Sequence, residues 1–138
     1  MFPFDAVDPT GADDYFVYIL YSGTGELHIT DVRLTSTVAG FMEPQVVTGT
    51  AAGGTAVGLV NRNLGSSKVP DGTYEFGVDI TGLTDAGHLH HMWLQANVEG
   101  HLGLNGHYII QPGQAMALLW TAATGILSGT VSMYEKLK

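Results

Sequence analysis

Two histidines separated by a single residue, His88 and His90, have the spacing in this chain that best suits chemistry. Residues two apart on a β-strand point to the same face, so a strand over residues 88–98 would present both imidazoles side by side. Two aligned imidazoles can begin a site for a transition metal. His88 and His90 are therefore the candidate metal ligands.

The segment from Gly82 to His90 also resembles the first motif of the cupins, which are jelly-roll proteins that bind a metal through three histidines and a glutamate. That resemblance implies a glutamate four or five residues after His90, where this chain has Leu94 and Gln95. It implies a further histidine in a second motif, where residues 112–116 read Pro-Gly-Gln-Ala-Met. Two of the four ligands are missing, so a cupin-like metal enzyme is kept only as the third and least favoured function.

Two readings of the histidines remain open. His101 and His107 lie nearby in the sequence and could replace the missing ligands. The favoured alternative is that the histidines bond across strands, or line an oligomer axis where identical side chains of several subunits converge. We therefore expect no metal and no other cofactor.

Catalysis by a nucleophile or by paired acids has no evident place in this sequence. None of the serines lies in Gly-x-Ser-x-Gly, and the glycine-rich segment 49–54 lacks the lysine of a phosphate-binding loop. The paired acids Asp13 and Asp14 have no enclosing apolar run that would raise a carboxyl pKa. We expect a protein that is not an enzyme.

The two tryptophans are candidate interaction residues. Trp120 ends an apolar run that has no polar alternation, which favours the core or a subunit interface. An exposed Trp93 would suit stacking against a sugar, so a carbohydrate-binding module stays open as an alternative function. Neither tryptophan has an Asn, Asp or Arg directly beside it in the sequence.

The composition predicts the elements that must position these residues. The chain has 138 residues with 19 glycines and few charges, which is typical of one all-β domain of short strands and tight turns. About eight strands with regular turn signals predict an antiparallel two-sheet, jelly-roll-like sandwich over residues 15–138.

Three local expectations follow from the strand pattern. Residues 15–21, the turn at Ser22–Gly25 and the strand from Glu26 predict a hairpin. The side-chain alternation slips at Thr30–Asp31, which predicts a β-bulge. Pro44 lacks a backbone donor, so residues 41–47 are expected to form an edge strand.

Residues 1–14 are expected to form an extended arm outside the sheet, because they hold prolines and aspartates without periodicity. Phe2 and Phe4 flank a proline in this arm and are predicted to dock on a neighbouring subunit. The start of the chain lacks the positive charge and apolar run of a signal peptide.

Charge, cysteine content and apolar runs limit the kinds of partner and compartment to be expected. The formal net charge of −8 disfavours nucleic acid. The absence of cysteine fits assembly in a reducing cytoplasm. The longest apolar stretch, residues 115–127, is too short and too interrupted for a membrane span.

Three stretches together resemble the small jelly-roll proteins that decorate or cement bacteriophage heads or form fibre knobs. They are Ile109–Trp120 with its Pro-Gly corner, Gly25–Thr35, and the C-terminal strand Thr130–Glu135. The resemblance covers roughly residues 15–135 and consists of strand and turn texture, without chemical signatures.

That resemblance implies a homotrimeric virion protein that binds the major capsid protein or another virion component and stabilises the head. Such a protein would assemble in the host cytoplasm, without nucleic-acid or membrane partners. Phe2, Phe4, Trp93 and Trp120 are then the expected interaction residues.

Overall fold

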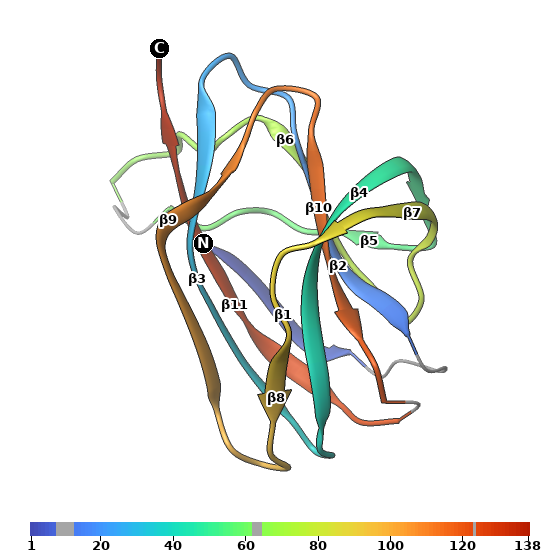
Figure 1. Cartoon of the computed structure of the whole chain (residues 1–138). Coiled ribbons are helices and arrows are strands. Elements are labelled where there is room, and N and C mark those ends of the chain that lie inside the picture. Colours follow the sequence, from blue (N-terminus) through green and yellow to red (C-terminus); the bar gives the residue numbers. More distant parts are fainter. Residues whose placement is uncertain (8–12, 62–64, 123) are drawn as a thin grey trace.

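The structure is a computed structural model that describes residues 1–7, 13–61, 65–122 and 124–138, with the side chains of residues 5–7 and 104–107 outside the description. It is an all-β sandwich of two antiparallel sheets, as the sequence predicts (Figure 1). The described residues form eleven strands instead of about eight. No helix in the described residues is long and apolar enough to cross a membrane.

Four strands form the smaller sheet, in the order β1-β11-β3-β9. Their bounds are β1 Phe2–Val7, β11 Leu127–Lys136, β3 Glu26–Ser36 and β9 Gly100–Ile110. The register between β3 and β9 shifts between Ile29 and Asp31, which confirms the predicted bulge. Because of this shift, Leu27 and Ile29 before it and Val32 and Leu34 after it all point into the main core.

Seven strands form the larger sheet, in the order β5-β6-β2-β10-β4-β7, with β8 also paired to β4. Their bounds are β2 Asp14–Tyr21, β4 Gly40–Ala52, β5 Thr55–Ala56, β6 Gly72–Phe76, β7 Thr81–His88, β8 Met92–Leu94 and β10 Ala115–Trp120. The far halves of β4 and β7 curve away from the sandwich (Figure 1). Gly49 and Gly82 face each other there with positive φ, and a side chain on Gly49 would meet the Gly82 carbonyl oxygen.

Two apolar cores result from this arrangement. The main core lies between the sheets and includes Phe16, Trp120 and Val131. A second, smaller core forms on the outer face of the larger sheet around Tyr18, Val47, Ile80 and Ala117. Side chains alternate between the faces of a strand, so β2, β4 and β10 contribute to both cores.

The expected arm is wrong for the first residues of the chain. Residues 2–7 form β1, which pairs with β11 at the edge of the smaller sheet. Phe2 and Phe4 are buried in the main core, where the Phe4 ring packs edge-on against Phe16. Burying two aromatic rings in the chain's own core outweighs the lack of periodicity around Pro3. Residues 8–12 of the expected arm lie outside the described part of the chain.

Two other local expectations are wrong. The strands on either side of Ser22–Gly25 do not pair with each other, because β2 belongs to the larger sheet and β3 to the smaller one. The strand that contains Pro44 lies inside the sheet, between β10 on one side and β7 and β8 on the other. The way in which β4 accommodates Pro44 creates the candidate site.

Candidate functional site

The candidate site begins at an interruption of the pairing along β4. Met42 pairs with Met92 of β8, and Gln45 pairs with His88 of β7, so the partner chain leaves the sheet between these points. The Pro44 carbonyl accepts a hydrogen bond of 2.8 Å from the Leu89 amide, so the proline nitrogen, which carries no hydrogen, faces the same side. Pro44 therefore offers no donor to a continuous partner strand there, and the chain at residues 89–91 bridges the gap instead.

Glu43 projects from the outer face of the larger sheet beside this interruption. It is only 7% exposed, and its carboxylate contacts the histidines on both sides of the gap. One oxygen pairs closely with His91 Nδ1 and the other lies 3.6 Å from His88 Nδ1. A buried carboxylate is costly unless it is paired and hydrogen-bonded, so these contacts hold residues 88–91 against β4.

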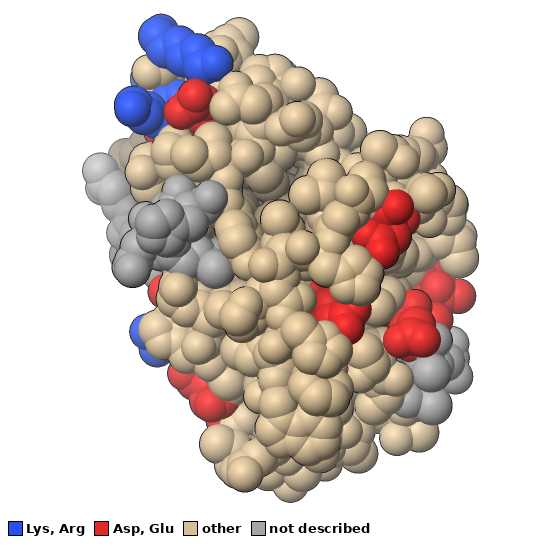
Figure 2. All heavy atoms as spheres, in the orientation of Figure 1, with Lys and Arg blue, Asp and Glu red and all other residues tan. Residues whose placement is uncertain are grey.

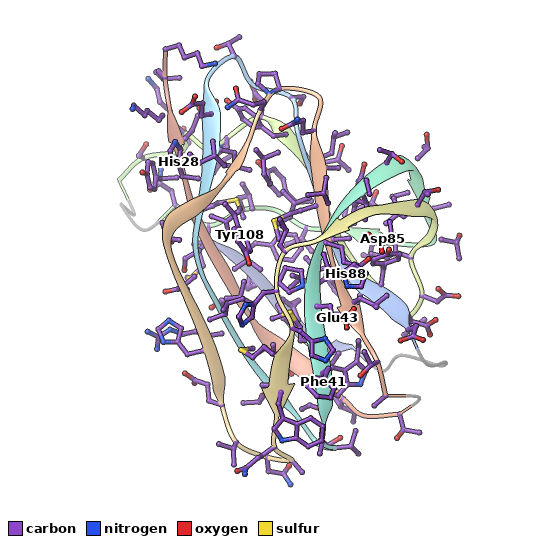
Figure 3. The ribbon with its side chains drawn as sticks, viewed as in Figure 1. His28, Phe41, Glu43, Asp85, His88 and Tyr108 are labelled. Atoms are coloured by element: carbon purple, nitrogen blue, oxygen red, sulfur yellow. The ribbon has the colours of Figure 1, made fainter. Side chains whose placement is uncertain are left out.

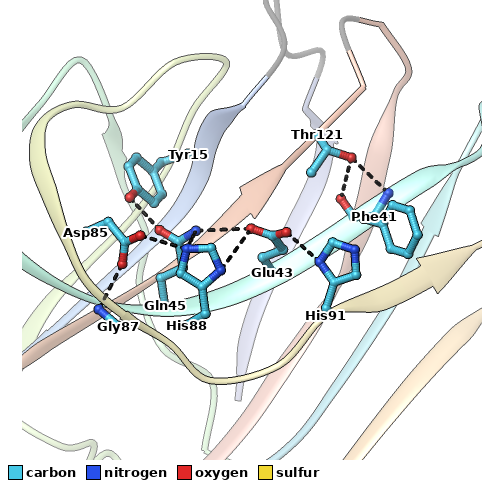
Figure 4. A network of polar contacts seen from close by, with 9 residues as sticks. All are labelled: Tyr15, Phe41, Glu43, Gln45, Asp85, Gly87, His88, His91 and Thr121. Atoms are coloured by element: carbon cyan, nitrogen blue, oxygen red, sulfur yellow. Dashed lines mark hydrogen bonds and ion pairs between the residues drawn. The ribbon is translucent and has the colours of Figure 1, made fainter.

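Further polar groups complete this arrangement, which we call the Glu43 cluster: Tyr15, Glu43, Gln45, Asp85, His88 and His91 (Figure 4). His88 Nε2 lies 2.7 Å from Asp85 Oδ2, and the Gly87 amide donates to Asp85 Oδ1 at 2.8 Å. The Gln45 amide donates to Glu43 Oε2 at 3.2 Å.

Tyr15 joins the Glu43 cluster to the second core. Its hydroxyl donates to Gln45 Oε1 at 2.6 Å, while its ring packs against the second core. Burial raises the pKa of Tyr15, and the negative charges of Asp85 and Glu43 raise it further. The tyrosine is therefore held in its neutral, donating form.

An aromatic row extends from the Glu43 cluster along the outer face. The His91 ring stacks on Phe41 with centroids 3.8 Å apart, and Phe41 meets Trp93 edge-on at 4.9 Å. Trp93 is 54% exposed, which leaves much of its indole open to a partner. Figure 3 shows Phe41, Glu43, His88 and Asp85 following one another along β4 and β7.

The expected pairing of His88 with His90 is wrong. β7 ends at His88, so His90 lies exposed in the bridging segment and the two residues do not share a strand face. His101 sits on the other sheet, 3.6 Å from Asp31, and the side chain of His107 lies outside the described residues. Across the described ranges, no three His, Asp or Glu side chains are placed to hold one metal ion.

The tryptophans differ in position. Trp120 is fully buried, and its indole nitrogen donates to the Thr124 carbonyl at 3.1 Å. Of the two settings expected for Trp120, the structure places it in the chain's own core, so it is not available as an interaction residue. Trp93 remains accessible.

Sequence reasoning missed Glu43, Asp85 and His91 as members of the site. Glu43 and Asp85 come from strands that pair only in the folded sheet, so no local spacing connects them to His88. One signal was available: Glu43 is the only charged residue in the predicted strand over residues 41–47, and a charged residue requires partners if its strand is buried.

Exposed apolar side chains collect in two other places. We call the exposed residues Trp93, Val98 and Ile126 the end patch; Val98 and Ile126 lie in connections that are hydrogen-bonded to residues 36 and 37, and Trp93 lies on β8, just before the first of these connections. There the Asn97 amide donates to the Ser36 carbonyl at 2.7 Å, and the Thr37 amide to the Ile126 carbonyl at 3.2 Å.

The second place is the flank groove, formed by Val46, Leu89 and Ile109 around a cavity of about 160 Å³. A larger groove of about 490 Å³ runs between residues 59–61 and 68–70 on one side and the end of β11 on the other. Neither cavity is lined by a member of the Glu43 cluster.

Comparison of the chain with protein-family models, with curated proteins and with solved structures found no match. Function is therefore inferred from the geometry of the site and its surroundings. The contacts of the Glu43 cluster hold the bridging segment against β4. The ring contacts of His91 with Phe41, and of Phe41 with Trp93, connect this cluster to an exposed indole.

Proposed function

We propose that this chain is a non-enzymatic virion protein, a decoration or cement protein that binds and stabilises a phage head as a homotrimer. One observation carries the proposal. The sandwich already has a closed main core, yet it leaves large apolar side chains exposed in the end patch, where folding does not require them. Grouped apolar side chains on a surface are typical of protein contact sites.

The contacts around Trp93 support the proposal, because they hold this part of the end patch in place before a partner binds. Trp93 lies on β8, held by its pairing with Phe41, and the Glu43 cluster fixes the residues just before that strand. Binding of a partner therefore costs little conformational entropy at this surface. The net charge of −8 would direct the chain toward capsid surfaces that are neutral or basic.

The test is sedimentation of the purified protein with heads that lack it. We expect saturable binding by the wild-type protein and strongly reduced binding by Val98→Glu, which places a charge in the end patch. Val78→Glu is the matched control, because Val78 is exposed to a similar degree, 44% against 51%, in a loop of the larger sheet. No binding by folded wild-type protein, or equal loss in both variants, would contradict the proposal.

A second function, binding of carbohydrate, is favoured by the aromatic row. An exposed indole braced by an aromatic neighbour is a surface on which a sugar ring can stack. On a glycan array, Trp93→Ala would abolish binding, whereas Tyr134→Ala, which removes an exposed aromatic ring on the other sheet, would not. If the array shows no glycan for the wild-type protein, this second function is rejected.

A further inference from the structure

At one edge of the smaller sheet, β11 extends beyond the strand that pairs with it. β1 pairs with β11 only as far as Val131, whereas β11 continues to Lys136 with β3 on its other side. In the described part of the chain, no strand pairs with residues 133–136 on the β1 side. An antiparallel strand directs the N–H and C=O groups of alternate residues toward each neighbour. Part of the backbone of residues 133–136 therefore faces the position of a missing strand.

The larger groove, of about 490 Å³, lies along this unpaired edge, and we call it the β11 groove. Residues 59–61 and 68–70 form the wall opposite β11. A hydrogen bond of 2.9 Å from the Val60 amide to the Met1 carbonyl holds that wall beside the start of β1. The β11 groove therefore continues the line of β1 past its first residue.

Side chains from both faces of β11 reach the β11 groove. Met133 packs against the main core, whereas Tyr134 is 47% exposed on the outer face, where it stacks on His28. The opposite wall adds Val60 and Val69, which are 43% and 42% exposed. An extended chain in the groove would therefore have apolar contacts on both of its faces. Proteins bind an added strand at such an edge, where backbone hydrogen bonds give affinity and side-chain contacts give specificity.

Three of the five cations of this acidic chain lie around the β11 groove. Lys68 lines it, Lys136 ends β11, and Lys138 lies just beyond. Lys138 pairs with Glu26 at 3.8 Å, but no carboxylate of the described residues forms an ion pair with Lys68 or Lys136. Glu135 also lines the groove, but its carboxylate accepts a hydrogen bond from a buried tyrosine. Figure 2 shows basic side chains gathered at the end of the molecule where Figure 1 places the C-terminus.

From these features we infer that the β11 groove binds an extended acidic peptide segment of a partner protein, which pairs with residues 133–136 as an added strand. Lys68 and Lys136 are the cations that its carboxylates would meet. The same lysines disfavour a second copy of this edge, because like charges on adjacent strands repel each other. An acidic strand carries the complementary charge, which gives the groove its specificity.

This inference goes beyond the proposed function, because it concerns a different surface. The end patch includes Ile126, which lies just before β11 begins, whereas the β11 groove follows the last residues of that strand. Binding of a peptide and binding to phage heads should therefore respond to different substitutions.

The test uses the full chain and a synthetic library of peptides of about six residues, the length of a typical strand. In these peptides Val, Ile, Leu or Thr alternates with Asp, Glu, Lys or Ser. We expect the bound peptides to be enriched in Asp and Glu over Lys. Fluorescence anisotropy of the best peptide, labelled with fluorescein, then gives its dissociation constant for each protein variant.

Lys68→Glu and Lys136→Glu should each weaken binding by about tenfold or more, because each places a like charge beside the acidic strand. Arg33→Glu is the matched control, since it makes the same change of charge on β3 at a residue that does not line the groove. The control should change the affinity by less than about twofold. Circular dichroism establishes that each variant is folded.

Two readouts do not depend on these variants. Proline at alternate positions of the peptide removes the backbone donors that would pair with β11, so it should abolish binding. Bound peptide should also increase the protection of amides within residues 133–136 from hydrogen exchange.

The inference would be overturned if no library peptide binds, if lysine is preferred, if the control loses as much affinity as the lysine variants, or if residues 133–136 gain no protection. Protection that rises with protein concentration without peptide would assign the groove to a second copy and overturn it as well. None of these outcomes bears on the binding of phage heads by the end patch.

Discussion

Replacing Glu43 by glutamine tests whether the Glu43 cluster clamps the bridging segment. The substitution keeps the shape of the side chain, removes its charge and turns one acceptor oxygen into an NH₂ group. The wild-type carboxylate pairs with His91 and accepts from Gln45 at 3.2 Å in a nearly closed environment. Hydrogen bonds to charged groups contribute about 1.5–3 kcal/mol each, and neutral ones about 1 kcal/mol.

The difference over the two contacts gives an expected loss of about 2 kcal/mol in the free energy of unfolding of Glu43→Gln. For a domain of this length that corresponds to a fall in Tm of about 6–10 °C. Urea denaturation followed by tryptophan fluorescence measures the loss, because the indole of Trp120 leaves the core on unfolding.

Glu99→Gln is the matched control for this measurement. Glu99 also pairs with a cation, Arg33 at 3.5 Å, but both side chains are more than half exposed. Exposed ion pairs contribute little, so the control should change stability by less than about 0.5 kcal/mol. If Glu43→Gln differs from this control by less than about 0.5 kcal/mol, the cluster is not a clamp and the reasoning fails.

Hydrogen exchange gives a second, local readout of the same substitution. The Leu89 amide donates to the Pro44 carbonyl directly beside Glu43. Loosening of residues 88–91 should lower its protection by more than the global loss of stability accounts for. Unchanged relative protection of Leu89 would also refute the clamp.

Three further predictions concern the two sheets and the ionisable groups. Phe2→Ala should lower the free energy of unfolding by about 3–5 kcal/mol, because it removes a fully buried ring; a loss below about 0.5 kcal/mol in urea denaturation would show that residues 2–7 are an unpaired arm after all. Burial is the largest cause that raises the pKa of Tyr21 and Tyr74. Their contribution to the free energy of unfolding should therefore be fully present below the unfolded-state pKa of about 10 and be lost as the pH rises through the folded-state values. A free energy of unfolding that does not decrease between about pH 8 and pH 12 in urea denaturation would contradict this. Hydrogen bonds from Gln111 and His28 lower the pKa of Glu26. The contribution of Glu26 to stability is therefore present above its unfolded-state pKa and is lost as the pH falls through the lower folded-state pKa. A carboxyl NMR titration should show the pKa of Glu26 rising in Gln111→Ala, and an unchanged pKa would exclude the hydrogen bond from Gln111.

The strand content of the fold could be predicted from the sequence because alternation is a local property. The slip at Thr30–Asp31 is an example, since only a bulge lets Leu27 and Val32 both face inward, and the register shift occurs there. The pairing of strands could not be predicted in the same way. The Ser22–Gly25 turn suits a hairpin, but it also suits the connection between two sheets that the chain adopts.

The candidate site could be predicted only in part. His88 has a role, but its partners Glu43 and Asp85 are brought to it by the register of β4 and β7, which the sequence does not encode locally. The rule that places Pro44 on an edge strand treats the partner of a strand as continuous. Here the partner chain is divided into β7 and β8, so a central strand tolerates a proline.

The central claim is that this chain assembles with copies of itself to act as a structural protein, and native mass spectrometry of wild-type protein purified without added metal tests it most directly. The proposed assembly predicts an oligomer, expected to be a trimer, whose mass is an integral multiple of the chain mass with no retained ion. A monomer that carries one transition metal per chain would contradict it and would return His88 and the surrounding carboxylates to consideration as a metal site.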